Sequence, residues 1–349
     1  MKIIDFKLSR ITAELKKPFI TNLRRVDAIE DVLLTLITDE GIAGYGEAPP
    51  TAAITGEDIE SIERSIGGAI FGAIRGMDAD ERIFEALHEA LPKNTSAKAC
   101  VDMAIYDILS KKGQKPLYEY LGGEAGALNT NLTISLNDIP TMLSDAVSGY
   151  EDGFSILKVK VGEGEEESVE ITRLIREHLP DVIIRLDANQ AWDSAKSLRI
   201  ANKVAKYGIE LIEQPVKADD FVGLKEVTIH SPIPILADES VFSYEDAVRI
   251  LDERAANYIN IKLMKTGGIY EAVKIAALAK ERGAKVMMGS MLESVVSVSA
   301  AVHFAMSDTN ICFYDLDGPL LAKPSSVTNS LMFDKDKISL KECIGLGVY

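Results

Sequence analysis

Four consecutive stretches in the middle of the sequence share an apolar core of strand length and a charged or polar end: SILKVKV (155–161), VIIRLDAN (182–189), GIELIEQP (208–215) and IPILADES (233–240). The segments that separate or follow them have the apolar spacing of amphipathic helices, namely residues 165–178, 194–207 and 244–252. A strand followed by a helix, repeated along a chain, indicates a parallel sheet that is covered by helices.

The same pattern extends in both directions until eight strands are counted. The further strand cores are NLTISL (131–136), YINIKLM (258–264), AKVMMGS (284–290) and ICFYDLDG (311–318), with helical spacing at 269–282 and 294–306. The polar strand ends recur every 24–27 residues between Thr133 and Asp315. This period is typical of a (β/α)8 barrel. An open doubly wound sheet would carry a G-x-G-x-x-G turn after an early strand, which the sequence lacks. We therefore predict an α/β protein with a modified TIM barrel over residues 123–320.

The first part of the chain has a different order of elements. Residues 2–13 and 28–47 have strand patterns, the latter interrupted by a turn at 38–41, and helices are predicted near 59–74, 80–91 and 97–111. Strands followed by helices predict a separate α+β unit over residues 1–122. Residues 321–349 no longer keep the barrel period, and we expect them to return to this unit.

The composition excludes several classes of protein. The 349 residues are 47% hydrophobic and 26% charged, which is the balance of a folded chain rather than a disordered one. A net charge of −16 argues against nucleic acid or an anionic membrane as a partner. Uncharged stretches such as 65–74 and 294–307 are shorter than the ~20 apolar residues of a membrane span. Three cysteines without C-x-x-C spacing and an N-terminus without an apolar signal segment lead us to expect a cytoplasmic protein.

Three carboxylates end three adjacent predicted strands: Asp187, Glu213 and Asp238. The carboxyl ends of barrel strands converge at one mouth, where these side chains would repel one another unless a cation were present. Oxygen ligands of this kind suit Mg²⁺ or Mn²⁺ better than zinc. The alternative is a structural ring of salt bridges with Arg185 and the nearby lysines.

Lysines flank the three acids. Lys158 and Lys160 are two residues apart on one strand, so both side chains are expected to point into the barrel. Lys262 ends the strand four positions further on, half a turn around an eight-stranded barrel. Two ammonium groups on opposite sides can reach both faces of a bound carbon, and a base at neutral pH requires a pKa below the usual ~10.4. Alternatively, the lysines only neutralise the acids.

As an ordered set, the motifs at these strand ends resemble the enolase superfamily and, within it, the muconate-lactonizing subgroup: Lys158-Val-Lys160, Asp187-Ala-Asn189, Glu213-Gln-Pro215, Ala237-Asp238-Glu239-Ser240 and Asn260-Ile-Lys262. The resemblance covers almost the whole chain and implies that the α+β unit is a capping domain. It implies that Asp187, Glu213 and Asp238 hold Mg²⁺ and that Lys160 and Lys262 act as opposed acid–base groups. It also implies that Lys158 binds the carboxylate of the substrate. In that superfamily a lysine or histidine base removes a proton while Mg²⁺ stabilises the enediolate.

Two further features describe the ligand. Asp315 and Asp317 end the last barrel strand on one side, away from the metal trio, and call for a cation such as a substrate ammonium group. Their alternative role is to cap the loop before Gly318-Pro319. In the segment PFITNLRR (18–25), Arg24 could pair with a second carboxylate over the barrel mouth, or could be a surface arginine. Together these features predict a small acidic dipeptide.

The Asp315-x-Asp317 and Phe19-x-Thr21-x-x-Arg24 patterns are similar to those of the dipeptide epimerases in the superfamily. The similarity implies that the aspartates hold the N-terminal ammonium, that Arg24 binds a glutamate side chain, and that Thr133 contacts the dipeptide backbone. It implies epimerisation of L-Ala-L-Glu and L-Ala-D-Glu in muropeptide recycling, with Lys160 serving the L face and Lys262 the D face. We also expect a homo-oligomer.

Four alternatives remain at this point. N-acylamino acid racemase and o-succinylbenzoate synthase share the fold and the bases but need no substrate ammonium. A Schiff-base lyase would use a barrel lysine without a metal. A non-catalytic metabolite-binding barrel would bind its ligand without turnover.

Overall fold

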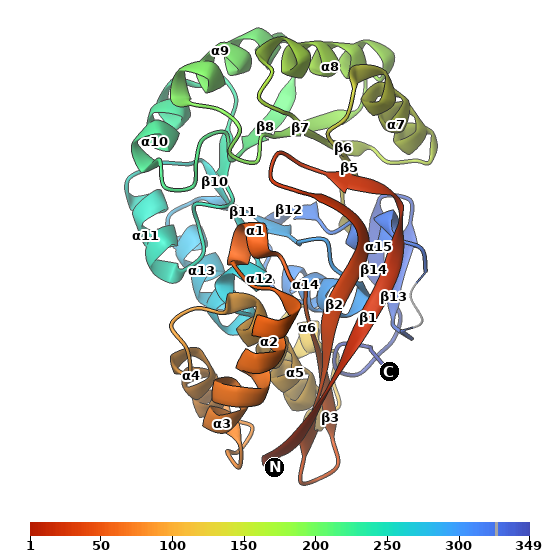
Figure 1. Ribbon diagram of the computed structural model, residues 1–349, viewed down its shortest axis with the longest axis vertical. Coiled ribbons are helices and arrows are strands. Elements are labelled where there is room, and N and C mark those ends of the chain that lie inside the picture. Colours follow the sequence, from red (N-terminus) through yellow and green to blue (C-terminus); the bar gives the residue numbers. More distant parts are fainter. Residues whose placement is uncertain (325–326) are drawn as a thin grey trace.

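An eight-stranded parallel sheet forms the centre of the molecule, in the strand order β12-β11-β10-β9-β8-β7-β6-β5. The computed structural model describes residues 1–324 and 327–349, and Figure 1 shows the sheet curled inside a ring of helices. The two end strands meet through Asn131 N, which donates to Tyr314 O at 3.2 Å, and Thr133 N, which donates to Asp317 at 2.6 Å. The predicted (β/α)8-type barrel is therefore confirmed.

The barrel strands coincide closely with the predicted apolar cores. They are β5 (Leu132–Ile134), β6 (Ile156–Lys160), β7 (Ile183–Asp187), β8 (Ile209–Glu213), β9 (Ile235–Ala237), β10 (Tyr258–Lys262), β11 (Lys285–Gly289) and β12 (Ile311–Asp315). The helices that follow them are α7 (Ile139–Glu151), α8 (Glu165–His178), α9 (Ser194–Val204) with a 3-10 turn η2 (Ala205–Tyr207), α10 (Phe221–His230), α11 (Tyr244–Asp252), α12 (Leu263–Thr266), α13 (Ile269–Glu281), α14 (Val295–Ala305) and α15 (Gly318–Leu321).

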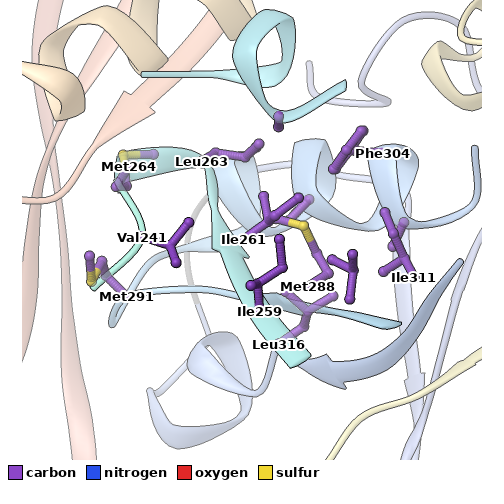
Figure 2. Close-up of a cluster of buried hydrophobic side chains, with 14 of the residues drawn as sticks. Val241, Ile259, Ile261, Leu263, Met264, Met288, Met291, Phe304, Ile311 and Leu316 are labelled. Carbon is purple, nitrogen blue, oxygen red and sulfur yellow. The ribbon is translucent and has the colours of Figure 1, made fainter. Parts of the chain in front are cut away.

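Side chains alternate between the inside and the outside of the barrel along each strand. Those on the inside form an apolar layer in the middle of the barrel and a polar layer at its carboxyl end. Leu211, Leu236, Met287 and Phe313 form a buried cluster of their own, and the next side chain of the same parity on each strand is polar or absent. On the outer face, Ile259, Ile261 and Met288 pack with Phe304 of α14, as Figure 2 shows. The strands are therefore anchored on their outer side while their upper inner side chains form the site.

The N-terminal unit contains a three-stranded antiparallel sheet of β1 (Ile3–Ile20), β2 (Arg25–Thr38) and β3 (Ala43–Ala48). Its helices are α1 (Ala52–Thr55), α2 (Ile59–Ser65), the π segment η1 (Ile66–Ile70), α3 (Phe71–Ile74), α4 (Glu81–Glu89), α5 (Thr95–Lys112) and α6 (Leu117–Tyr120). The first two strands are longer than predicted, because pairing resumes at Phe19–Val26 after an irregularity that begins at Glu14. They form one long hairpin, red in Figure 1, that reaches the barrel.

Two carboxylates of the N-terminal unit cap helices of the barrel. Glu47 accepts hydrogen bonds from Ser294 N at 2.7 Å and Ser297 N at 2.9 Å, at the start of α14. Asp102 accepts one from Ile269 N at 2.6 Å, at the start of α13. Neither helix has a side-chain cap at its own N-cap residue. The carboxylates thus satisfy helix ends that would otherwise be buried without partners, and hold the two units together.

The last segment of the chain contacts both units. Strands β13 (Leu331–Asp334) and β14 (Lys337–Leu340) pair with β4 (Leu128–Asn129), and Leu346 N donates to Asp107 of α5 at 2.8 Å. The predicted boundaries 1–122, 123–320 and 321–349 stay a prediction. All three cysteines are free thiols, and no helix among the described residues is long and apolar enough to cross a membrane.

Candidate active site

A pocket lies at the carboxyl ends of the barrel strands, closed from above by the β1–β2 hairpin. Seven of the residues singled out in the sequence line it: Arg24, Thr133, Lys158, Lys160, Lys262, Asp315 and Asp317. Asp187, Glu213 and Asp238 are fully buried behind this lining and touch its lysines. Asn189 and Glu239, which the sequence motifs contain but to which no role was assigned, also line the pocket, as do Ile54, Leu292 and Leu321, which the sequence did not indicate.

The strand ends are brought together by the register of the sheet. Lys160 is paired with Asp187, and Asp187 with Glu213, at the same level of three neighbouring strands. On the other side, Lys262 is level with Gly289 and Gly289 with Asp315. A Cβ on Gly289 would lie 2.6 Å from Asn260 Oδ1, so glycine makes room for the amide that donates to Glu213 at 2.9 Å.

Lys158 is the most heavily engaged of the lysines. Its Nζ lies 2.6 Å from Asp315 Oδ2, 2.8 Å from Glu213 Oε2 and 3.0 Å from Asp187 Oδ2, and its side chain is 1% exposed. Lys160 Nζ contacts Asp187 Oδ2 at 2.5 Å. The predicted role of Lys158 toward a substrate carboxylate stays a prediction, since its ammonium already bridges three acids of the chain.

Asp238 is held between two lysines, one of which was not predicted. Lys262 Nζ donates to its Oδ2 at 2.7 Å, and Lys265 Nζ lies 2.6 Å from its Oδ1. Gln214, from the Glu-Gln-Pro motif, accepts from Asp238 N at 2.9 Å. Gln214 has a positive φ of 36° and Asn189 one of 39°, uncommon values for residues other than glycine that often accompany functional sites.

In the chain without a bound cation, burial and neighbouring charges shift the pKa values of lysines and acids in the site. Burial opposes the charged form of Lys262, but the adjoining Asp238 carboxylate outweighs it, so the pKa of Lys262 is raised rather than lowered. The same balance, with Asp187, Asp315 and Glu213 as partners, raises the pKa of Lys158. Burial and Asp187 raise the pKa of Glu213 to about 7. The lowered lysine pKa that a base needs at neutral pH depends on a bound cation and stays a prediction.

The buried carboxylates at the barrel mouth have the chemistry of a site for a divalent cation. Six buried acids, Asp187, Glu213, Asp238, Glu239, Asp315 and Asp317, face four buried ammonium groups, Lys158, Lys160, Lys262 and Lys265. Outside residues 325–326, no three His, Cys, Asp or Glu side chains are already assembled around a point where an ion could sit. Glu213 Oε2 and Asp238 Oδ1 nevertheless accept no hydrogen bond of good geometry in the described part of the chain. An oxygen-only set with an excess of two negative charges suits a hard divalent cation.

The two aspartates at the end of β12 have different environments. Asp315 accepts from Lys158 at 2.6 Å and from Asn131 at 2.7 Å, and although burial opposes ionisation, the lysines hold its pKa at about 2. Asp317 accepts only from Thr133 N at 2.6 Å and has no cationic partner among the described residues. Burial and the neighbouring Asp315 raise the pKa of Asp317 to about 7. Of the carboxylates that line the pocket, Asp317 and Glu239 thus form no ion pair among the described residues, and Asp317 is the one beside Asp315 at the end of β12.

At the tip of the β1–β2 hairpin, Arg24 is a cation that faces the pocket without an ion pair among the described residues. Within residues 1–324 and 327–349, no acid lies within ion-pair distance of its guanidinium, and burial lowers its pKa. Its backbone is fixed because Thr21 Oγ1 accepts from Arg24 N at 3.3 Å. Asn22 Nδ2 donates to Ala188 O at 2.8 Å and Val161 O at 3.1 Å, which ties the tip to the strand ends of β6 and β7. Arg24 therefore lies on an anchored hairpin turn over the pocket.

The closed pocket is small. Its cavity is about 50 Å³, whereas ligand pockets commonly enclose ~300–1,000 Å³. A second cavity of about 440 Å³ shares Phe19, Thr133 and Leu321 with it. Lys160 Nζ lies 5.9 Å from the centre of the Phe19 ring. Movement of the hairpin tip would enlarge the space around the lysines.

Comparisons with known proteins agree with the geometry. The family model of the enolase C-terminal domain-like type matches residues 141–349, and that of the mandelate racemase/muconate lactonizing enzyme N-terminal domain matches residues 4–122. The chain is 44% identical to the L-Ala-D/L-Glu epimerase of Clostridium acetobutylicum, over 100% of this chain and 99% of that protein. The predicted resemblance to the superfamily is confirmed.

Solved structures give the same result. The substrate-liganded L-Ala-D/L-Glu epimerase from Bacillus subtilis superposes with a TM-score of 0.98 and 42% identity, covering 100% of this chain and 99% of that chain. The dipeptide epimerase from Enterococcus faecalis, complexed with Mg and L-Leu-L-Tyr, has a TM-score of 0.96 and 36% identity, covering 100% and 99% of the two chains.

Proposed function

The chain belongs to the mandelate racemase/muconate lactonizing enzyme family of the enolase superfamily, and from that premise we propose that it epimerises acidic dipeptides. The proposed reaction interconverts L-Ala-L-Glu and L-Ala-D-Glu at the glutamate α-carbon. The observation that carries the proposal is a pocket with two lysines on opposite strands, an uncompensated carboxylate on Asp317 and an unpaired guanidinium on Arg24. The similarity to dipeptide epimerases supports the proposal.

The two lysines supply the acid–base chemistry. Lys160 on β6 and Lys262 on β10 are four strands apart in an eight-stranded barrel and both line the pocket. In our proposal Lys160 removes the α-proton of the L epimer and Lys262 returns a proton to the opposite face, and the reverse reaction exchanges their roles. An ammonium group on one side and an amine on the other give inversion, whereas a single base would return the proton to the face it came from.

The ends of the pocket match the ends of the dipeptide. We propose that Asp317 and Asp315 bind the N-terminal ammonium, with Thr133 beside them, and that Arg24 binds the glutamate side chain. Lys158 would lie near the α-carboxylate.

Asp187, Glu213 and Asp238 are the residues that would hold the cation. Mg²⁺ bound there would neutralise these acids and stabilise the negative charge that develops on the substrate carboxylate when its α-proton is removed. The chain holds two of the three acids in place through Gln214, which fixes the backbone of Asp238, and Asn260, which donates to Glu213. Since acidic dipeptides of this kind occur in cell-wall peptides, the proposal includes a cytoplasmic role in muropeptide recycling.

A panel of matched substrates tests the proposal. We expect Mg²⁺-dependent epimerisation of L-Ala-L-Glu, followed by chiral chromatography after hydrolysis, and at least tenfold slower turnover of N-acetyl-L-glutamate, which lacks the ammonium group. Faster turnover of the N-acyl compound would contradict the dipeptide proposal and favour an N-acylamino acid racemase. Dehydration of the o-succinylbenzoate precursor without epimerisation would favour the synthase. Asp317→Asn should impair the dipeptide reaction only.

A further inference from the structure

One buried lysine of the site has no role in the proposed reaction. Lys265 is 0% exposed and does not line the pocket. Its Nζ donates to Asp238 O at 2.6 Å and Asn260 O at 2.8 Å, and lies 2.6 Å from Asp238 Oδ1. Two N–H groups of the ammonium thus donate to carbonyl oxygens, and the ammonium also forms an ion pair with the Asp238 carboxylate at Oδ1. The group is therefore engaged by oxygens of the chain rather than by the pocket.

The backbone around Lys265 is held as firmly as its ammonium group. Lys265 lies in the single turn α12, directly after the end of β10 and three residues after Lys262. Leu263 and Met264 on the same turn are buried members of the hydrophobic core and are labelled in Figure 2. The turn ends at Gly267, whose φ of 83° suits glycine. The position of the ammonium group is thus set by packing on one side and by β9 and β10 carbonyls on the other.

We propose that Lys265 is a positioning residue. Its ion pair with Asp238 Oδ1 fixes the orientation of the Asp238 carboxylate, so that Oδ2 faces Lys262. This inference rests on the proposed function. Burying an ammonium group is costly, and a buried ion pair can often be replaced by apolar side chains without loss of stability, so stability alone does not account for Lys265. The contact with both the Asp238 carboxylate and its carbonyl fixes the rotamer beside the Lys262 base.

The proposal predicts an effect on one face of the substrate. Lys262 depends on Asp238, whereas Lys160 contacts Asp187, which Lys265 does not touch. In Lys265→Met, a change of similar size, loss of the α-proton from L-Ala-D-Glu in D₂O should slow at least tenfold more than loss from L-Ala-L-Glu. The rates are measured by ¹H NMR at saturating Mg²⁺ during the first turnovers, when each epimer reports its own base.

A second variant separates positioning from charge. Lys265→Arg keeps the positive charge but cannot reproduce the two hydrogen bonds to carbonyl oxygens together with the ion pair at Asp238 Oδ1, so we expect Mg²⁺ to bind several-fold more weakly in calorimetry without dipeptide. It should also show the same asymmetry of exchange, and replaces Lys265→Met where that variant does not fold. Lys98→Met is the matched control, because Lys98 is also buried and donates to a backbone carbonyl, that of His88 at 2.7 Å.

The outcomes separate this inference from the proposed function. Equal slowing of both epimers, or no slowing, together with wild-type Mg²⁺ affinity in Lys265→Arg, would overturn the positioning role while leaving the epimerase proposal intact. Absence of exchange from either epimer in the wild-type protein would overturn the proposed function. In that case an unchanged Mg²⁺ affinity in Lys265→Arg would overturn the positioning role as well, and a weaker affinity would support it.

Discussion

At the scale of single residues, Asp317 predicts a dependence of dipeptide binding on pH. Burial and Asp315 raise the pKa of Asp317 to about 7, so the group is protonated below that pH and loses the negative charge that an ammonium group needs. The KM for L-Ala-L-Glu should therefore rise about tenfold between pH 8 and pH 6, since ionisation falls about tenfold per unit below the pKa. Steady-state kinetics across this range measure the effect.

The variant Asp317→Asn isolates this carboxylate. Its KM should be high at every pH and should lack the rise between pH 8 and pH 6, while its thermal stability remains close to that of the wild type. A variant that keeps the wild-type pH profile of KM would show that another group causes the dependence.

The position of Arg24 predicts a preference for dipeptides whose second residue is glutamate. Replacement by alanine removes a charged, two-pronged donor, which is worth about 2 kcal/mol and therefore about thirtyfold in kcat/KM for L-Ala-L-Glu. The value for L-Ala-L-Leu should change less than threefold. Arg25→Ala is the matched control, since Arg25 is exposed and pairs with Asp27 at 3.1 Å. Equal losses for both dipeptides would rule out a specific contact.

Single residues also show where sequence reasoning succeeds and where it stops. Lys160, Asp187 and Lys262 could be predicted because they recur at the period of the barrel strands, and the register of the sheet then places them together. Lys265 and Glu239 lie outside that period, on a turn and a loop, and their burial depends on contacts between strands far apart in sequence. The engagement of Lys158 with three acids is a result of packing that spacing cannot show.

At the scale of elements, the β1–β2 hairpin brings Arg24 to the pocket. Its length could not be predicted, because the adjacent charged residues Lys16 and Lys17, followed by Pro18, break the alternation by which strands are recognised. Its tip is held by the two hydrogen bonds of Asn22 to Ala188 O and Val161 O. Since the cavity beneath the tip is about 50 Å³, we expect this contact to open and re-form during turnover.

Loosening the tip should weaken substrate binding more than chemistry. In Asn22→Ala we expect the KM for L-Ala-L-Glu to rise about five- to tenfold, with kcat changed less than threefold, because each lost hydrogen bond contributes about 1 kcal/mol. Hydrogen exchange of the backbone amides at 18–25 should become faster in the free variant. Unchanged exchange at the tip would contradict the anchoring role of Asn22.

At the scale of the whole molecule, the capping unit and the barrel form one body through carboxylates that cap helices across the boundary. Glu47→Gln leaves the start of α14 facing an amide that can accept fewer of its N–H groups, and should lower the free energy of unfolding by about 2 kcal/mol. Urea denaturation measures this change. Glu85→Gln on the exposed face of α4 is the control and should be neutral. Equal stability of the two variants would exclude the capping contribution.

For the whole molecule we propose chemistry at the barrel mouth, where two lysines exchange a proton on a dipeptide α-carbon with the help of a divalent cation. ¹H NMR of L-Ala-L-Glu in D₂O, with Mg²⁺ and then with EDTA, tests it most directly. The account predicts loss of the glutamate α-proton signal with the appearance of L-Ala-D-Glu, and its arrest by EDTA. Retention of that signal with Mg²⁺ present, for this and every other Ala-X dipeptide, would contradict it.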